Sequence, residues 1–295
     1  MNILVIKLGA FGDVVLAFQP FADIRAHHPG ARITLLTTAP FGFLAGAPWF
    51  DAVVTDRRPR WWDMAGVMAL RRMLRGFDLV YDLQTSGRSS RYHVLAGRPA
   101  WSGIARGASL RHVHRERDGM HTVERQRDQL AVAGVPPGPV ADLGWLTRGA
   151  PEVPGPFAML VPGAAMHRPG KRWPAESFGV LAAMLAARGV RPVVVGARQD
   201  APWAAIIALA CPSVLDLTGR TSLPEVAGLA AQAAVAVGND TGPMHLAAAV
   251  GCPCVVLFGA DSDPALTAPR GAAVTVLRVD HLADLPVDRV AAVLP

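Results

Sequence analysis

The sequence has no apolar run of about 18 residues, the length that a membrane-spanning helix needs. Hydrophobic residues make up 51% of the 295 residues and the mean hydropathy is +0.28, but alanine accounts for much of both values. Between Met1 and the first apolar run at residues 3–6 there is no basic segment and no cleavage site of the kind that a signal peptide carries. We therefore expect a cytoplasmic protein.

Cysteine is also scarce, since the chain has only Cys211, Cys252 and Cys254. So small a number fits a reducing compartment. Cys252 and Cys254 flank a single proline and lack the spacing and the partner ligands of a zinc site. We expect them to pack in the core.

Two common nucleotide-binding patterns are missing. The turn after the first apolar run reads G-x-x-G-D at residues 9–13, which differs from the G-x-G-x-x-G of dinucleotide-binding folds. The Gly-Lys-Ser/Thr ending of a P-loop is absent as well. These absences argue against a dehydrogenase and against a nucleoside triphosphatase.

The net charge of +6 is unevenly distributed. Residues 1–150 carry 19 Lys and Arg against 12 Asp and Glu, whereas residues 151–295 carry 10 against 11. A basic first half suggests an anionic partner, either a phosphorylated lipid, an acidic membrane surface or a nucleic acid, although general use of arginine would give the same excess. No nucleic-acid-binding motif accompanies the arginines, so nucleic acid is the partner we least expect.

The length allows two domains of about 150 residues. Short apolar strands alternate with helices throughout, which predicts doubly wound parallel sheets of the Rossmann-like type. Residues 134–156 are rich in Pro and Gly and read as a linker. We place the domain boundaries at residues 1–150 and 151–295.

Residues 234–259 form a predicted strand-turn-helix-strand unit that carries the main candidate site of the second half. An apolar strand leads into the turn Gly-Asn-Asp-Thr-Gly-Pro, a short helix follows, and a second buried strand comes after it. Because ligands collect at the carboxyl ends of parallel strands, and a helix start offers free N–H groups, this turn is a candidate anion site. An ordinary turn with a core-facing histidine is the other interpretation. The candidate residues are Asp240, Thr241, Gly242 and His245.

Other polar turns follow strands in the same way. Asp13, beside two glycines, could act as a base or could simply cap a helix over residues 13–25. Residues 57–62 place three arginines beside two tryptophans, which suits a phosphorylated, lipid-linked acceptor or else a solvated loop. Candidate acceptor contacts are Arg57, Arg58, Arg60, Gln84 and Arg88.

The turn GNDTGPMHLAAA resembles the signature of glycosyltransferase family 9, the ADP-heptose:lipopolysaccharide heptosyltransferases. The family pattern of Asp-Thr-Gly, two residues and His-Leu-x-Ala-Ala falls on residues 240–249. Residues 7–13, 162–174 and 218–223 resemble three further family segments in the same order, so the resemblance covers nearly the whole chain.

The resemblance implies a GT-B fold, in which two Rossmann-like domains face each other across a cleft. The first domain would bind the acceptor and the second the nucleotide sugar. The implied reaction is an inverting, metal-independent transfer of a sugar, heptose from ADP-heptose in the usual family reaction, onto a phosphorylated lipopolysaccharide-core or related glycan. No metal or other cofactor is expected. Contact with the cytoplasmic face of the inner membrane would bring the enzyme to such a glycolipid.

Residue roles follow from the same resemblance. Asp13 falls on the catalytic base, and Lys171 on the lysine that holds the diphosphate. Lys7 falls on a lysine common in the family and is a further candidate acceptor contact. Asp200 stands where relatives often carry Glu, and Ala164 and Ala165 where they often carry Thr or Ser. Asp261-Ser262-Asp263 matches the family's Gly-x-x-Asp-Pro loop, so we do not expect it to bind a metal. The implied nucleotide-sugar residues are Gly163, Ala164, Ala165, Lys171, Asp200, Thr221, Asp240, Thr241, Gly242 and His245.

Two alternatives stay open. A sugar-nucleotide epimerase or hydrolase with the same fold would need no acceptor face and would consume donor alone. A non-catalytic protein that binds a sugar nucleotide or a lipid would be indifferent to the substitution Asp13→Asn.

Overall fold

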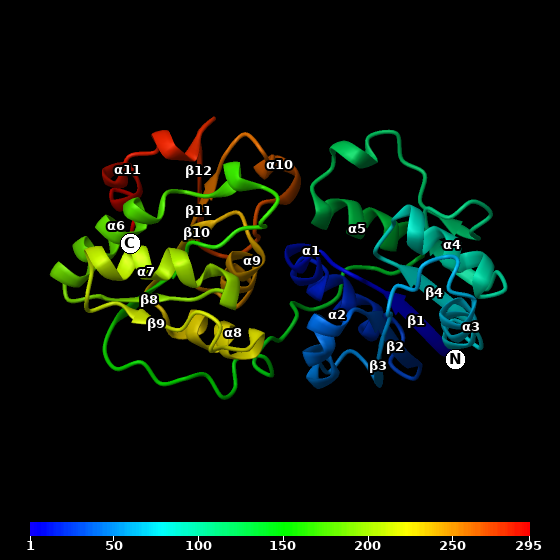
Figure 1. Cartoon of the computed structure of the whole chain (residues 1–295). Coiled ribbons are helices and arrows are strands. Elements are labelled where there is room, and N and C mark those ends of the chain that lie inside the picture. The colour runs from blue at the N-terminus through cyan, green and yellow to red at the C-terminus, as the bar shows by residue number, and fades with distance from the viewer. The chain divides into compact units, whose positions relative to one another are not determined.

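The computed structural model describes residues 1–295, which form two compact units, Met1–Trp145 and Leu146–Pro295 (Figure 1). The division falls inside the proline- and glycine-rich segment over residues 134–156. No helix in either unit is both long enough and apolar enough to cross a membrane.

The first unit is built on one parallel sheet. Its strands are β1 (Asn2–Ile6), β2 (Arg32–Thr37), β3 (Ala52–Thr55), β4 (Leu79–Asp82), β5 (Ala100–Gly103) and β6 (Leu110–Arg111), in the order β3-β2-β1-β4-β5-β6. Its helices are α1 (Phe11–Val15), α2 (Phe18–His27), α3 (Met64–Met73), α4 (Gly87–Leu95) and α5 (Thr122–Val132), with the 3-10 segments η1 (Ala39–Gly46) and η2 (Arg117–Gly119).

The strand order reverses direction at β1. The chain adds β2 and β3 on one side of β1 and then returns to place β4 on the other side. Four of the five β1 residues are buried, as expected for a strand covered on both faces. The reversal leaves the turns after β1 and β4 side by side at the carboxyl edge of the sheet, where ligands bind in such folds.

The second unit repeats this plan. Its strands are β7 (Phe157–Val161), β8 (Arg191–Val194), β9 (Leu215–Asp216), β10 (Val235–Asn239), β11 (Cys254–Phe258) and β12 (Val274–Arg278), in the order β12-β11-β10-β7-β8-β9. Its helices are α6 (Ala175–Ala187), α7 (Ala201–Ala210), α8 (Leu223–Gln232), α9 (Gly242–Ala249), α10 (Pro264–Thr267) and α11 (Val287–Ala291), with η3 (Pro169–Lys171), η4 (Arg198–Asp200) and η5 (Leu282–Asp284).

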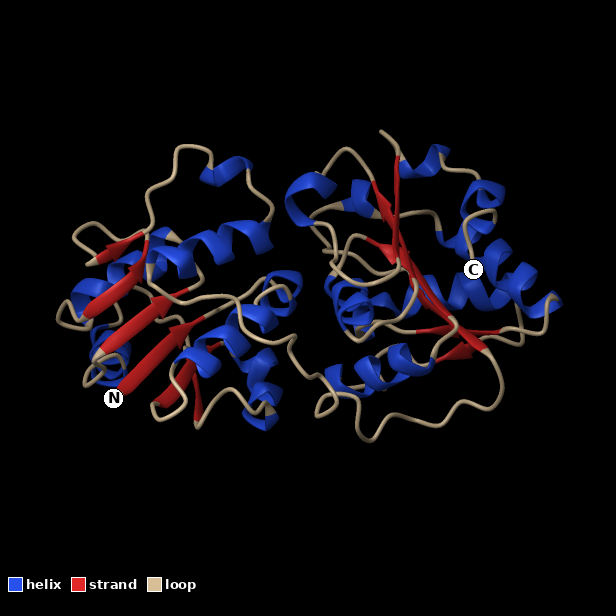
Figure 2. Ribbon diagram, turned by 180° about the vertical axis from the view of Figure 1, so that it is seen from behind, coloured by secondary structure: helices blue, strands red, loops and turns tan.

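Each sheet is a layer of strands covered by helices on its faces (Figure 2). In the second unit all residues of β7, β10 and β11 are buried, and they pack with α6 and α7 in a single core that includes Trp173 and Phe178. The reversal here lies between β7 and β10. The turns that follow these two strands therefore meet at the edge where a ligand would bind.

One predicted helix differs from the structure. Residues 13–25 were expected to form a single helix, but α1 ends at Val15 and α2 begins at Phe18. Pro20 explains the break, because proline has no backbone N–H and is tolerated only in the first turn of a helix. In the structure Pro20 lies in that first turn of α2.

Candidate active site

An ion pair links the two turns at the reversal of the second sheet. The Nζ atom of Lys171, at the end of η3, lies 2.5 Å from Oδ2 of Asp240, which follows β10. The Nε2 atom of His245, on α9, lies 3.8 Å from the other carboxylate oxygen of Asp240. Three of the predicted donor-site residues thus meet at the N-terminal end of α9.

The environment keeps Asp240 ionised. Burial by itself would raise the pKa of this carboxyl group, but the contacts with His245 and Lys171 outweigh burial and lower the pKa to about 2. Asp240 therefore carries a full negative charge at neutral pH. Nδ1 of His245 is buried and has no hydrogen-bond partner in the protein.

Asn239 closes the loop that carries Lys171. Its side-chain Oδ1 accepts a hydrogen bond from the backbone N–H of Trp173 (3.0 Å), and its Nδ2 donates to the carbonyl of Pro162 (2.8 Å). Asn239 is completely buried. It joins both ends of residues 162–173 to the end of β10, a role that the sequence analysis did not assign to it.

The predicted diphosphate turn begins at Gly163, directly against Asp200. A Cβ atom at Gly163 would lie 2.6 Å from Oδ2 of Asp200, so any larger residue would displace this carboxylate. The carboxylate accepts a hydrogen bond from the N–H of Ala197 (2.9 Å), while its Oδ1 has no partner. Burial raises the pKa of Asp200. Thr221, half-buried in the loop after β9, also has an unpartnered hydroxyl.

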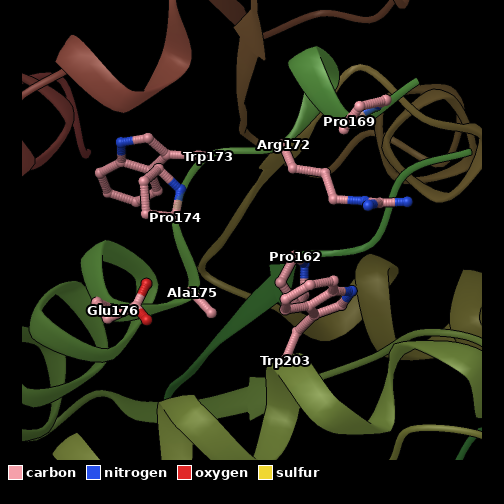
Figure 3. Close-up of a pocket in the computed structure, with 8 residues that line it drawn as sticks. All are labelled: Pro162, Pro169, Arg172, Trp173, Pro174, Ala175, Glu176 and Trp203. Carbon is pink, nitrogen blue, oxygen red and sulfur yellow. The ribbon is translucent and has the colours of Figure 1, made fainter. Parts of the chain in front are cut away.

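A cavity of about 230 Å³ adjoins this loop (Figure 3). The guanidinium of Arg172 lies 5.5 Å from the ring centroid of Trp203. Trp173 turns the opposite way from Arg172 and donates from Nε1 to the carbonyl of Leu285 (2.9 Å). The lining residues are Pro162, Pro169, Arg172, Trp173, Pro174, Ala175, Glu176 and Trp203.

The acidic triplet at residues 261–263 does not gather metal ligands. Oδ1 of Asp263 accepts a hydrogen bond from the N–H of Ala265 (3.0 Å) and caps α10. The same atom lies 3.7 Å from Nη1 of Arg278. The structure contains no cluster of three or more His, Cys, Asp or Glu side chains that could hold a metal ion.

In the first unit, hydrogen bonds tie the turn after β1 to the turn after β4. Nζ of Lys7 donates to the carbonyl of Leu83 (3.1 Å), and the N–H of Leu8 donates to Oε1 of Gln84 (2.8 Å). Asp13, on α1, is half-buried and accepts a weak hydrogen bond from the N–H of Ala10 (3.3 Å). Asp13 is thus not the N-cap of its helix, because α1 begins at Phe11 with Ala10 as its N-cap and Asp13 reaches back to Ala10 from the third helical position. Its other carboxylate oxygen makes no hydrogen bond in the protein.

Lys7 is only 4% exposed. Burial lowers its pKa to about 8, against the opposing influence of Asp13. Asp82, at the end of β4, is completely buried, and burial raises its pKa to about 6 although it accepts hydrogen bonds from the N–H groups of Gln84 and Thr85. A buried cation thus lies beneath the candidate base, a feature that the sequence did not reveal.

The arginine loop over residues 57–62 is held in place by stacking. Arg88, on α4, lies 5.1 Å from the ring centroid of Trp61, and its Nη2 donates to the carbonyl of Pro59 (2.8 Å). Arg58 donates from Nη2 to the carbonyl of Leu8 (3.1 Å), which places it beside the turn after β1. Arg57 and Arg60 are exposed, and Arg60 lies over Trp62 at 5.3 Å.

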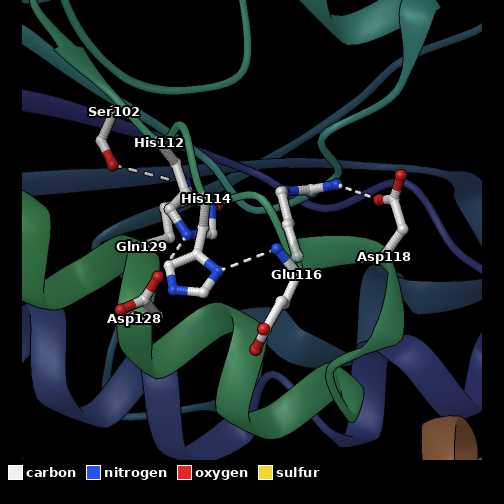
Figure 4. A network of polar contacts seen from close by, with 8 residues as sticks. Ser102, His112, His114, Glu116, Asp118, Asp128 and Gln129 are labelled. Carbon is white, nitrogen blue, oxygen red and sulfur yellow. Dashed lines mark hydrogen bonds and ion pairs between the residues drawn. The ribbon is translucent and has the colours of Figure 1, made fainter.

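A separate polar network follows β6 (Figure 4). Nε2 of His112 lies 2.6 Å from Oδ2 of Asp128, and Nδ1 of His114 accepts a hydrogen bond from the N–H of Glu116 (3.2 Å). Gln129 donates from Nε2 to the hydroxyl of Ser102 (3.3 Å). The contact of His112 fastens residues 110–118 to α5, and the contact of Gln129 joins α5 to β5.

The sequence profile described as "Glycosyltransferase family 9 (heptosyltransferase)" matches residues 67–290. The chain belongs to glycosyltransferase family 9. Its predicted family is confirmed, and so is the predicted fold of two Rossmann-like parallel-sheet domains, which is the GT-B fold of the solved heptosyltransferases.

Individual members of the family show how far the similarity extends. Lipooligosaccharide heptosyltransferase 2 of Haemophilus influenzae is 36% identical over 129 residues, which cover 42% of this chain and 37% of that protein. Lipopolysaccharide heptosyltransferase 1 of Escherichia coli K12 is 28% identical over 301 residues, covering 92% of this chain and 91% of that protein. The solved E. coli heptosyltransferase WaaC with ADP has a TM-score of 0.82 at 26% identity, covering 99% of this chain and 98% of that one.

Proposed function

We propose that this family 9 chain transfers heptose from ADP-heptose to a phosphorylated acceptor of the lipopolysaccharide core or a related glycan. The observation that carries the proposal is the Lys171–Asp240–His245 cluster at the start of α9. It combines a partly buried cation, an unpartnered imidazole nitrogen and the free N–H groups of a helix start at the reversal point of the sheet. This is the combination that binds a diphosphate.

The second unit would hold the donor. When the bond between the sugar and the diphosphate breaks, negative charge develops on the phosphate oxygen, and fixed donors lower the barrier by stabilising it. Lys171, the N–H groups of the Gly163–Ala164–Ala165 turn and the Thr241–Gly242 helix start are those donors in our proposal. Asp200 and Thr221 offer the unpartnered Oδ1 and hydroxyl to the ribose side of the nucleotide.

The first unit would hold the acceptor. Asp13 takes the proton from the acceptor hydroxyl as that hydroxyl attacks the anomeric carbon, and a single displacement inverts the configuration. Because Lys7 is buried, we propose that it acts by orienting the turns around Asp13 and not by touching the acceptor. Arg57, Arg58, Arg60, Gln84 and Arg88 would receive the acceptor phosphates.

The proposed mechanism needs no metal, since Lys171 and the backbone donors supply the positive charge. We also propose that the enzyme works at the cytoplasmic face of the inner membrane, where Trp62 and the arginine loop reach the glycolipid. Nucleic acid has no part in the proposal.

The test measures thermal-shift binding of ADP, UDP, GDP and CDP to the wild type and to Lys171→Ala, followed by a transfer assay with ADP-heptose. We expect a saturable shift with ADP that the substitution weakens. If the protein prefers UDP or GDP, glycosyl transfer remains the proposed reaction, but ADP-heptose is not its donor. Donor breakdown without acceptor would favour an epimerase or hydrolase, and no response to any nucleotide would refute the proposal.

A further inference from the structure

Arg172 and Lys171 are neighbours in the chain, yet their side chains diverge. Arg172 has an extended backbone (φ −109°, ψ 121°), in which successive side chains point to opposite sides. Lys171 contacts Asp240 at the end of β10, whereas Arg172 lies over Trp203 on α7, which follows β8. Since β7 lies between β10 and β8 in the sheet, the two cations flank the loop after β7 from opposite sides.

Arg172 binds the backbone of this loop. Its Nη2 donates to the carbonyls of Ala164 (3.2 Å) and Ala165 (3.1 Å) and contacts the Sδ atom of Met166 at 3.4 Å. Both carbonyls therefore point toward the Trp203 side of the loop. The ring of Trp203 holds the guanidinium there.

The direction of the carbonyls fixes the direction of the neighbouring amides. In a planar trans peptide the C=O of one residue and the N–H of the next point in opposite directions. With the carbonyls of Ala164 and Ala165 turned toward Arg172, the N–H groups of Ala165 and Met166 point toward the Lys171 side. Neither N–H donates a hydrogen bond within the protein. Two adjacent free N–H groups on one side of a loop form an anion-binding concavity.

We propose that Arg172 is a positioning residue that turns the N–H groups of Ala165 and Met166 toward the diphosphate of the bound nucleotide. The proposal rests on the proposed function for the identity of the ligand. It also explains how a turn with alanine at residues 164 and 165, and hence no hydroxyl donors, can bind phosphate through its backbone alone.

The first experiment observes the loop without ligand. Selective ¹⁵N-methionine labelling gives at most nine backbone signals in the wild type and ten in a variant that gains a methionine. Met166→Leu, made in the wild type and in each variant, identifies the signal of Met166. We expect Arg172→Met to shift the Met166 amide in the ligand-free protein. Arg168→Met is the matched control, because Arg168 is an exposed arginine of the same loop, and it should leave the signal in place. An unmoved Met166 signal in Arg172→Met would overturn the proposal.

The second experiment measures affinity for ADP and AMP by calorimetry. In our proposal the amides face the phosphate farthest from the ribose. Arg172→Met should therefore weaken the affinity for ADP roughly tenfold, the loss expected for hydrogen bonds to a charged group, and leave the affinity for AMP within about twofold of the wild type. Trp203→Ala should lose part of the affinity for ADP, and Arg172→Lys should lose less of it than Arg172→Met does.

The outcomes separate the two proposals. If Arg168→Met and Arg172→Met lose the same affinity for ADP, the effect is one of charge alone and the positioning role of Arg172 is overturned. If Arg172→Met weakens the affinities for ADP and AMP equally, the substitution disturbs the whole site, and the positioning role is overturned as well. Failure of the wild type to bind ADP would refute the proposed function, while the Met166 signal would still decide whether Arg172 sets the loop.

Discussion

The backbone N–H of Trp173 donates a hydrogen bond to Oδ1 of Asn239 at 3.0 Å, inside the core of the second unit. The same side chain donates to Pro162 at the other end of the loop. One buried amide therefore fixes both ends of the loop that presents Lys171. A buried amide with both of its groups engaged is costly to replace, because any apolar substitute leaves two backbone groups unsatisfied.

We predict that Asn239→Leu lowers the free energy of unfolding by about 2–4 kcal/mol, since an unsatisfied buried N–H and C=O each cost about 1–3 kcal/mol. Urea unfolding at pH 7 measures the change. Gln199→Leu replaces an exposed amide and serves as the control, for which we expect a change within about 0.5 kcal/mol. A loss below about 1 kcal/mol in Asn239→Leu would contradict the role of Asn239.

The Lys171–Asp240 ion pair predicts an acid-dependent difference between the wild type and Lys171→Met. The folded pKa of Asp240, about 2, lies below its ordinary value of 3.8, so its stabilising effect is complete above pH 4 and is lost as the pH falls toward 2. This effect amounts to about 2 kcal/mol. In Lys171→Met the pKa of Asp240 should rise, because burial then acts with less opposition.

The measurement is the free energy of unfolding of both proteins in urea between pH 5 and pH 2.5. We expect the wild type to be more stable at pH 5 and the two curves to converge as the pH falls. Parallel curves would show that Lys171 does not depress the pKa of Asp240.

Much of the fold could be predicted from the sequence because the strands are short apolar runs bounded by turn residues. β7 and β11 are runs of this kind, five residues each and buried throughout. The exception at residues 13–25 came from Pro20, whose position in a first helical turn requires a new helix to begin. β6 could not be predicted, because two residues of strand give no periodic pattern.

The candidate site could be predicted only in part. Asp240 and His245 lie on one turn-helix segment, and Lys171 follows a strand that neighbours β10, so topology brings all three together. The roles of Asn239 and Arg172 could not be predicted, because both bind backbone atoms whose positions depend on the path of a loop. The burial of Lys7 likewise depends on how the turns after β1 and β4 close over it.

Lys7 predicts a dependence of stability on alkaline pH. Its folded pKa of about 8 lies below the ordinary 10.5, so the folded protein binds fewer protons than the unfolded chain between these values, and its stability rises with pH through that range. Lys7→Met has no ionisable group at this position, so its stability lacks this rise with pH. The wild type should therefore gain about 3 kcal/mol relative to Lys7→Met between pH 8 and pH 10.5.

Denaturant unfolding at pH 7.5, 9 and 10.5 tests this expectation. The opposite trend, in which the wild type loses stability relative to Lys7→Met as the pH rises, would show that the folded protein favours the charged lysine.

The surface beside the arginine loop predicts binding to anionic lipid. Trp62 is 74% exposed, and Met64, at the start of α3, is 67% exposed. Arginines that pair with phosphate and an indole at the headgroup level favour an acidic bilayer surface. We expect the protein to sediment with vesicles that contain phosphatidylglycerol, and we expect salt and Trp62→Ala each to weaken this binding severalfold.

Leu209→Ala is the matched control for that experiment, because Leu209 is 85% exposed but lies on α7 of the second unit. It should bind the vesicles as the wild type does. If Trp62→Ala and Leu209→Ala bind equally well, the lipid contact lies elsewhere.

Asp13→Asn separates catalysis from donor binding. Asparagine keeps a side-chain oxygen that can accept the hydrogen bond from Ala10, so α1 should form normally, but an amide cannot take a proton from the acceptor hydroxyl. We expect transfer from ADP-heptose to a phosphorylated lipopolysaccharide-core acceptor to fall by about 10²–10⁴-fold, the usual contribution of a general base. The dissociation constant for ADP, set by the second unit, should change less than about twofold. Asp23→Asn is the control. Asp23 is a buried aspartate on α2 that accepts a hydrogen bond from the N–H of Gly138, so this variant tests the effect of a destabilised first unit that keeps Asp13. Full transfer activity in Asp13→Asn would remove the base from the mechanism. If the wild type and Asp13→Asn bind ADP equally well and neither transfers heptose, the result would instead favour a non-catalytic nucleotide-binding role.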